Sequence, residues 1–197
     1  MWPYVYQEFM NGIIYTVDGH KFSKKVNIHV RKSTLQYIDG ENIKETINDD
    51  ILFVTIGNDQ YMPVSGKIMK VVGSKEKGFV ATLILADFSS IHATGGAYGS
   101  SSNSSSTMKL SSIEIGGETK TNHMDLKNNK ESGVTLNLVY SYYIVTNSNI
   151  YEATRKGIET KLPQERKVHF KAYLKSHNIQ WKVPASLLPL IDFLNEK

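Results

Sequence analysis

The stretches that decide the fold are "IIYTVDG" (residues 13–19) and "LQYIDG" (residues 35–40), each of which ends in an Asp-Gly pair. Apolar and polar residues alternate around both pairs, as in strands with one buried face. Asp-Gly often joins two such strands, because a type I′ hairpin turn needs positive φ at both central positions. The two stretches therefore predict antiparallel hairpins in the first part of the chain.

Further strand-like segments follow at short spacing. Residues 80–86, "VATLILA", are apolar on both faces, which is typical of a central strand that is covered on both sides. The longest signal, "VTLNLVYSYYIV", spans residues 134–145. The remaining segments are 51–57, 60–64, 67–72, 79–88 and 108–115. We therefore expect a mainly β fold, an antiparallel meander with a sandwich or barrel-like form.

The pattern becomes helical in the last quarter of the chain. In residues 163–176, Phe170, Tyr173 and Leu174 recur at the spacing of one helix face. Residues 186–194, "SLLPLIDFL", predict a short helix capped by Ser186.

The predicted organisation is a β-rich body followed by a small helical appendage, α+β overall. The body spans residues 1–153, and the helical segment spans residues 154–197 and is expected to pack on it. The longest apolar run is too short to span a bilayer, so no transmembrane segment is expected.

A Ser/Gly-rich tract, "GGAYGSSSNSSSTMKL" (residues 95–110), interrupts the β pattern with six serines and three glycines. Its glycine spacing matches neither a P-loop nor a dinucleotide-binding motif, so no nucleotide cofactor is expected. Such composition is also typical of linkers, but strand-like sequence lies on both sides. We interpret residues of about 89–107 as a long loop within the body. Tyr98 is the only aromatic side chain of residues 95–110 and is a candidate partner contact.

The sequence carries no recognisable catalytic or metal-binding motif. It has no cysteine, which excludes disulfides, thiolate catalysis and zinc–thiolate sites. The six histidines form no H-x-x-x-H pair, and neither a calcium loop nor a G-x-S-x-G elbow is present. Two carboxylates could still meet in three dimensions and act on a glycosidic bond. The sequence thus favours a protein that is not an enzyme, without catalytic residues, metal or cofactor.

The net charge of +4 is concentrated near the C-terminus, because residues 151–197 contain nine Lys/Arg and five Asp/Glu. Lys167, Lys171 and Lys175 recur every fourth residue and form a row on the side of the predicted helix away from Tyr173. This row could be a solvated helix face or a surface for an anionic partner. The candidate partner-binding residues are Tyr98, Arg166, Lys167, Lys171, Lys175 and Trp181.

A second candidate surface consists of tyrosines in and after the longest strand signal. Packing between strands explains such residues, but an exposed row of tyrosines could bind a glycan or a protein. The tyrosines are Tyr140, Tyr142, Tyr143 and Tyr151.

Several segments, in order along the chain, resemble segments of an uncharacterised family of exported proteins from Bacteroidetes. They are "GIIYTVDG", "LQYIDG", "ILFVTIG", "GAYGSSSNSSS" and "FKAYLKSHNIQWKVPASLLPLIDFL". In that family a leader peptide precedes the matched region, so the resemblance implies a periplasmic or cell-surface location. The start "MWPYVYQ" fits a chain that begins after a removed leader. Pro189 departs from the family, in which the last helix tends to have an uninterrupted, charged start.

Together these observations predict a non-catalytic envelope protein that binds other envelope components through its long loop and basic C-terminal segment. The partner could be an envelope protein, a glycan or a lipid. A carbohydrate- or lipid-binding module that uses exposed tyrosines is the alternative. A nucleic-acid-binding β domain is a second alternative, but the clustered basic density of such domains is lacking.

Overall fold

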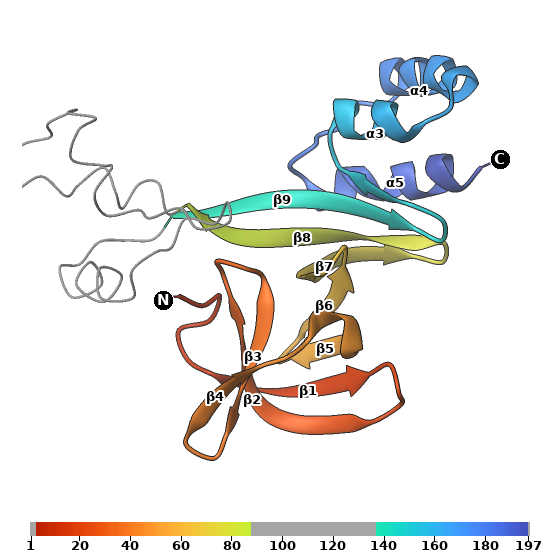
Figure 1. Ribbon diagram of the computed structural model, residues 1–197. Coiled ribbons are helices and arrows are strands. Elements are labelled where there is room, and N and C mark those ends of the chain that lie inside the picture. Colours follow the sequence, from red (N-terminus) through yellow and green to blue (C-terminus); the bar gives the residue numbers. More distant parts are fainter. Residues whose placement is uncertain (1–2, 88–136, 197) are drawn as a thin grey trace, which may run out of the picture. The chain divides into compact units, whose positions relative to one another are not determined.

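The computed structural model describes residues 3–87 and 137–196, and of these, residues 3–85 and 139–196 form one compact unit. Its strands form one sheet in the order β10-β9-β8-β7-β6-β5-β1-β2-β3-β4 (Figure 1). The elements before the gap are β1 (Met10–Thr16), β2 (Lys21–His29), β3 (Thr34–Asp39), β4 (Asn42–Glu45), the 3-10 turn η1 (Asn48–Asp50), β5 (Ile51–Ile56), β6 (Asp59–Val64), β7 (Lys67–Lys75) and β8 (Gly78–Asp87). After the gap come β9 (Asn137–Thr146), β10 (Ile150–Glu152), α3 (Arg155–Lys161), α4 (Gln164–Ser176) and α5 (Pro184–Asn195).

Two antiparallel meanders build this sheet. Strands β1 to β4 follow one another, strands β5 to β10 do the same, and β1 joins the two by pairing with both β2 and β5. The predicted mainly β fold with a small C-terminal helical appendage is confirmed. Two predicted features lie outside the described residues, namely the loop at about 89–107 and the strand at 108–115.

Both predicted Asp-Gly hairpins are present, but neither has positive φ at two adjacent turn residues. In the first, the Gly19 amide donates to the Thr16 carbonyl at 3.1 Å, and Gly19 alone has positive φ, 86°. In the second, Gly40 has φ 64° and its neighbour Glu41 keeps negative φ. The type I′ expectation is therefore wrong. A turn with one left-handed residue needs glycine at only that position, so the preceding aspartate keeps an ordinary backbone conformation.

The first core lies between the two meanders, because the sheet curls. Its buried side chains come from β1, β2, β3, β5, β6 and β7, and they are Ile14, Val26, Ile28, Leu35, Ile51, Val54, Ile56, Tyr61 and Ile68. The curl is closed by direct hydrogen bonds between the β2–β3 turn and β7. Ser33 Oγ donates to the Ile68 carbonyl at 2.5 Å, and the Ile68 amide donates to the Ser33 carbonyl at 2.8 Å. The buried Asn48 amide adds bonds to the carbonyls of Ser33 and Gly66.

The N-terminal segment is held against β2 by a buried asparagine. Asn27 is 0% exposed, its Nδ2 donates to the carbonyls of Tyr6 and Glu8, and its Oδ1 accepts from the Tyr6 amide. A buried amide whose donors and acceptor are all used costs little and fixes one register. Asn27 therefore ties residues 3–9 to the sheet.

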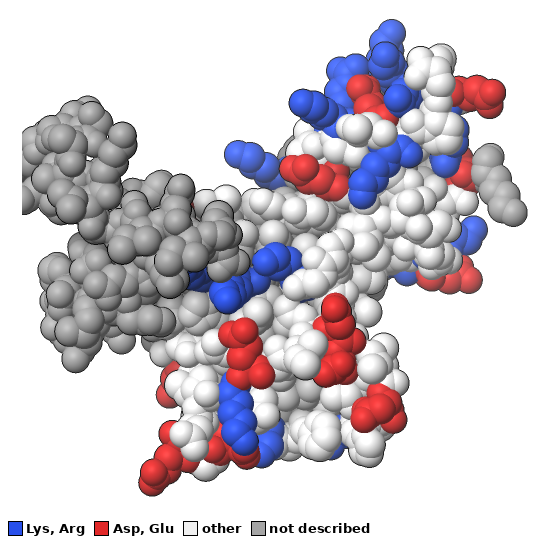
Figure 2. Space-filling view, in the orientation of Figure 1, with Lys and Arg blue, Asp and Glu red and all other residues white. Residues whose placement is uncertain are grey.

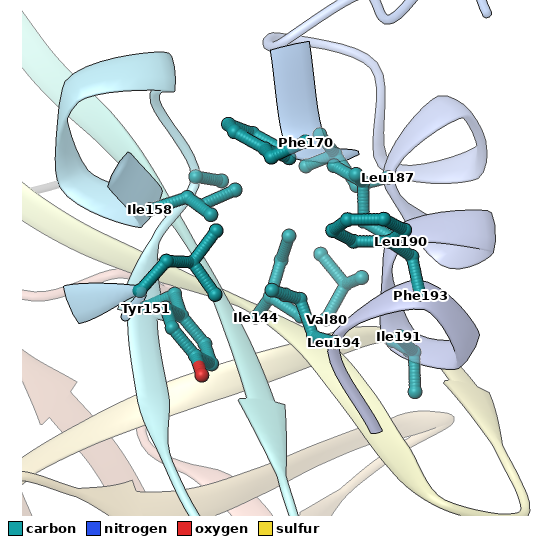
Figure 3. Close-up of a cluster of buried hydrophobic side chains, with 12 residues drawn as sticks. Val80, Ile144, Tyr151, Ile158, Phe170, Leu187, Leu190, Ile191, Phe193 and Leu194 are labelled. Atoms are coloured by element: carbon teal, nitrogen blue, oxygen red, sulfur yellow. The ribbon is translucent and has the colours of Figure 1, made fainter. Parts of the chain in front are cut away.

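The second core lies between β8, β9 and β10 and the three helices (Figure 3). Val80 and Ile144 contribute from the sheet, while Ile158 and Phe170, both 0% exposed, contribute from α3 and α4. Helix α5 contributes most of the rest, with Leu187, Leu190, Ile191, Phe193 and Leu194. Helices as short as α3 and α4 are marginal alone in water, so their stability comes from this shared burial. The helical segment is thus packed on the sheet.

Helix α5 begins earlier than the sequence predicts. It starts at Pro184, with Val183 as N-cap, whereas Ser186 lies inside the first turn and its Oγ accepts from the Gln180 amide at 2.8 Å. Proline at the first helical position has the required φ and lacks only an N–H that would be unpaired there. Pro189 then lies in the helix interior on an exposed position, where water can reach the carbonyl that its missing N–H leaves unpaired.

Candidate functional site

The predicted basic row lies on α4, at the surface of the C-terminal core. Lys171 and Lys175 are exposed and Lys167 is half-buried. Among the described residues, no carboxylate forms an ion pair with any of the three lysines. Figure 2 shows Lys and Arg side chains gathered over α3 and α4, with fewer acidic ones between them. On another side of α4, Phe170 is buried in the C-terminal core and holds the helix that carries the row.

Arg166 faces the core side of α4 and has a structural role. Its guanidinium donates to the carbonyl of Phe193 at 2.5 Å and to that of Leu194 at 3.4 Å, and it lies over the Phe193 ring. These carbonyls belong to the last turn of α5, where helical partners are missing and a cation is favoured. Arg166 thus caps α5.

Of the two predicted aromatic contacts, Trp181 is among the described residues. Trp181 is partly buried and packs against the C-terminal core, in the connector between α4 and α5. Tyr98 lies outside the described residues. The structure therefore keeps the three lysines together on α4, whereas Arg166 and Trp181 pack on the C-terminal core.

The tyrosines do not form one exposed row. Tyr151 is 3% exposed, Tyr142 packs against the C-terminal core, and Tyr143 packs on the other side of β9. Tyr140 alone of the four is well exposed, at 53%. Strand packing thus accounts for three of these side chains.

A polar cluster joins Tyr6 of the N-terminal segment to Asp59 and Tyr61 on β6 and to Lys70 on β7. Tyr6 Oη lies 2.8 Å from Tyr61 Oη and donates to Asp59 Oδ2 at 2.8 Å, while Lys70 Nζ lies 2.8 Å from Asp59 Oδ1. Burial raises the pKa of Tyr61 to about 12 and also raises the pKa of Tyr6. Partial burial pushes the pKa of Asp59 upward, but hydrogen bonds from Lys70 and Tyr6 outweigh it and lower the pKa. The phenols stay protonated at neutral pH, so the cluster anchors the N-terminal segment and offers no activated nucleophile.

A hollow that sequence reasoning missed lies at one end of the first core. Its volume is about 490 Å³, within the range of small-molecule sites. It is lined by Ile14, Thr16, Phe22, Lys24, Tyr37, Asp39, Glu45, Thr46, Ile47, Asp50 and Ile51. The available signal is the spacing Phe22–Lys24–Val26, which places one lysine on the core-facing side of β2.

Over residues 3–87 and 137–196, no three His, Asp or Glu side chains gather as metal ligands would. In the same residues, no helix combines the length and hydropathy of a membrane span.

Comparisons with known proteins give no relative. No protein-family model matches the chain, and searches of curated proteins and of solved structures find no similar protein. The resemblance to exported proteins of Bacteroidetes therefore stays a prediction.

Proposed function

We propose that the chain is a non-catalytic interaction module of the cell envelope, which docks through the basic row of α4 on the anionic headgroups of a membrane. The observation that carries the proposal is the row itself, in which Lys167, Lys171 and Lys175 have no ion-pair partner among the described residues. Like charges one helical turn apart repel each other, and an anionic partner relieves this repulsion.

The use of lysine rather than arginine in this row supports a lipid surface as the partner. Lysine lacks the planar fork with which arginine binds one phosphate in a fixed geometry, so a row of lysines suits a plane of headgroups without defined positions. Val168 is 68% exposed and lies between Lys167 and Lys171 on α4, so it adds an apolar contact beside the row. The large apolar side chains of α4 other than Val168, namely Phe170, Tyr173 and Leu174, face the core, so the helix is suited to lie on a membrane surface rather than insert.

The strength of membrane binding can be worked out from the charge of the row. A lysine near an anionic bilayer contributes about 1 kcal/mol, so three contribute about 3 kcal/mol, roughly a hundredfold in partitioning. Such binding is weak and reversible. The envelope location rests on the resemblance to exported proteins, and a coding sequence without a leader upstream would contradict it.

Cosedimentation with vesicles tests the docking. Vesicles of phosphatidylglycerol in phosphatidylcholine should retain the protein, pure phosphatidylcholine should not, and retention should fall steeply with added salt. Replacing Lys167, Lys171 and Lys175 by Gln should abolish retention. The matched control replaces Lys21, Lys25 and Lys32, which are exposed on β2 and the β2–β3 turn, and this variant should keep most of its retention.

Three results would overturn the proposal. They are equal loss in the two triple variants, retention that ignores salt, and tighter binding to duplex DNA than to the vesicles. The last result would favour the nucleic-acid alternative, since phosphate contacts of duplex DNA would then use the same row.

A further inference from the structure

The hollow at the end of the first core has an apolar floor and partly uncovered apolar walls. Ile14 and Ile51 on the floor are 5% and 2% exposed, whereas Phe22 and Ile47 on the walls are 46% and 69% exposed. These large apolar side chains surround one concavity and stay in contact with water. A ligand that covers them lowers the free energy, because it removes apolar surface from water.

The charged side of the hollow carries more positive charge than its one carboxylate neutralises. Lys24 Nζ lies 2.9 Å from Asp39 Oδ1, and Lys44 Nζ, beside the mouth, lies 2.5 Å from Asp39 Oδ2. Each ammonium has three donors and gives one to Asp39, so donors remain free on both lysines. Two lysines that share one aspartate leave a net charge of one at this position.

Of the two other carboxylates of the lining, Glu45 is held away from the two lysines. Glu45 Oε2 accepts from Thr34 Oγ1 at 2.9 Å and from Gln36 Nε2 at 2.8 Å. Thr34 and Gln36 alternate with the core-facing residues of β3, so this carboxylate is held on the outer face of the sheet. Asp50, on η1, also lines the hollow, and its negative charge disfavours a ligand with a second acidic group.

We propose that this hollow binds a small amphipathic monocarboxylate. Its aliphatic or aromatic body covers Ile14, Ile51 and Phe22, and its carboxylate accepts hydrogen bonds from Lys24 and Lys44. The apolar floor and the pair of lysines that shares Asp39 together favour this class, since charge-assisted hydrogen bonds orient the acid at the mouth. The site is separate from the basic row of α4, so this proposal does not depend on whether the chain docks on a membrane.

Titration with decanoate, followed by the methyl NMR signals of Ile14 and Ile51, tests the proposal. We expect saturable shifts of these methyl groups with decanoate, binding of decanol about tenfold weaker, and weaker binding still of decylamine. Replacing Lys24 and Lys44 together by Gln should weaken the binding of decanoate about tenfold, because a charge-assisted interaction is lost, and should leave the binding of decanol unchanged. Unchanged decanol binding shows that the variant hollow remains intact.

Lys25→Gln is the matched control, because Lys25 is exposed and adjacent to Lys24 but lies on the other face of β2. It should bind decanoate as the unmodified protein does. Absence of saturable shifts, binding of decylamine as tight as that of decanoate, or an equal loss in Lys25→Gln would each overturn the assignment.

Discussion

Replacing Phe170 by Ala should destabilise the whole folded unit, because this ring joins α4 to the C-terminal core. Phe170 is 0% exposed, and its ring centroid lies 5.7 Å from that of Phe193. Truncating a buried phenylalanine costs about 3–5 kcal/mol, from lost burial and from the cavity that remains. For a chain of this size that loss lowers Tm by roughly 6–20 °C.

Urea unfolding followed by two probes measures this loss. Fluorescence of Trp181 reports the C-terminal core when Trp2 is replaced by Phe in every protein compared, and far-UV circular dichroism reports the sheet. Val168→Ala is the control within the same helix, because Val168 is 68% exposed and should cost less than about 0.5 kcal/mol.

Two outcomes would refute the reasoning. A loss below about 1 kcal/mol for Phe170→Ala would mean that the ring is not enclosed as the structure has it. Separate transitions for the two probes would mean that the helical segment unfolds apart from the sheet, against the shared core of β8, β9 and the helices.

Three further substitutions test other contacts. Arg166→Met removes the cap of α5 and should cost about 1–3 kcal/mol in urea unfolding, with Arg166→Lys recovering only part, whereas a neutral result would contradict the capping role. Hydrogen bonds from Lys44 and Lys24 lower the pKa of Asp39 to about 2 in the folded protein, below the usual 3.8. The ionised Asp39 therefore stabilises the fold fully above pH 3.8, and this stabilisation is lost as the pH falls toward 2. Asp39→Asn should flatten the dependence of unfolding free energy on pH in this range. An unchanged dependence would refute the pairing of Asp39 with the two lysines. Gly12→Ala places a Cβ 2.4 Å from Val26 Cγ2 and should cost about 1–3 kcal/mol by overpacking, measurable as a lower urea midpoint.

Much of the fold can be predicted from local sequence, but less of the site can. The alternation around Asp18-Gly19 and Asp39-Gly40 predicts the hairpins, because strand periodicity and glycine turns act within about ten residues. The row of lysines on α4 follows from helical spacing in the same way. The role of Arg166 could not be predicted, since its partners are the carbonyls of another helix, 27 and 28 residues away.

The sequence by itself determined most of the strands, the two longer helices and where charge gathers along the chain, whereas α3 was not predicted. The tertiary structure alone decided how these segments meet. Pairing of β1 with β5 joins two meanders, Ser33 meets Ile68 across the curl, and Lys44 joins Lys24 on one carboxylate at the mouth of the hollow. The physical reason is range: periodicity and turn preference are properties of neighbouring residues, whereas core burial and ion pairing depend on which distant surfaces the folded chain brings together.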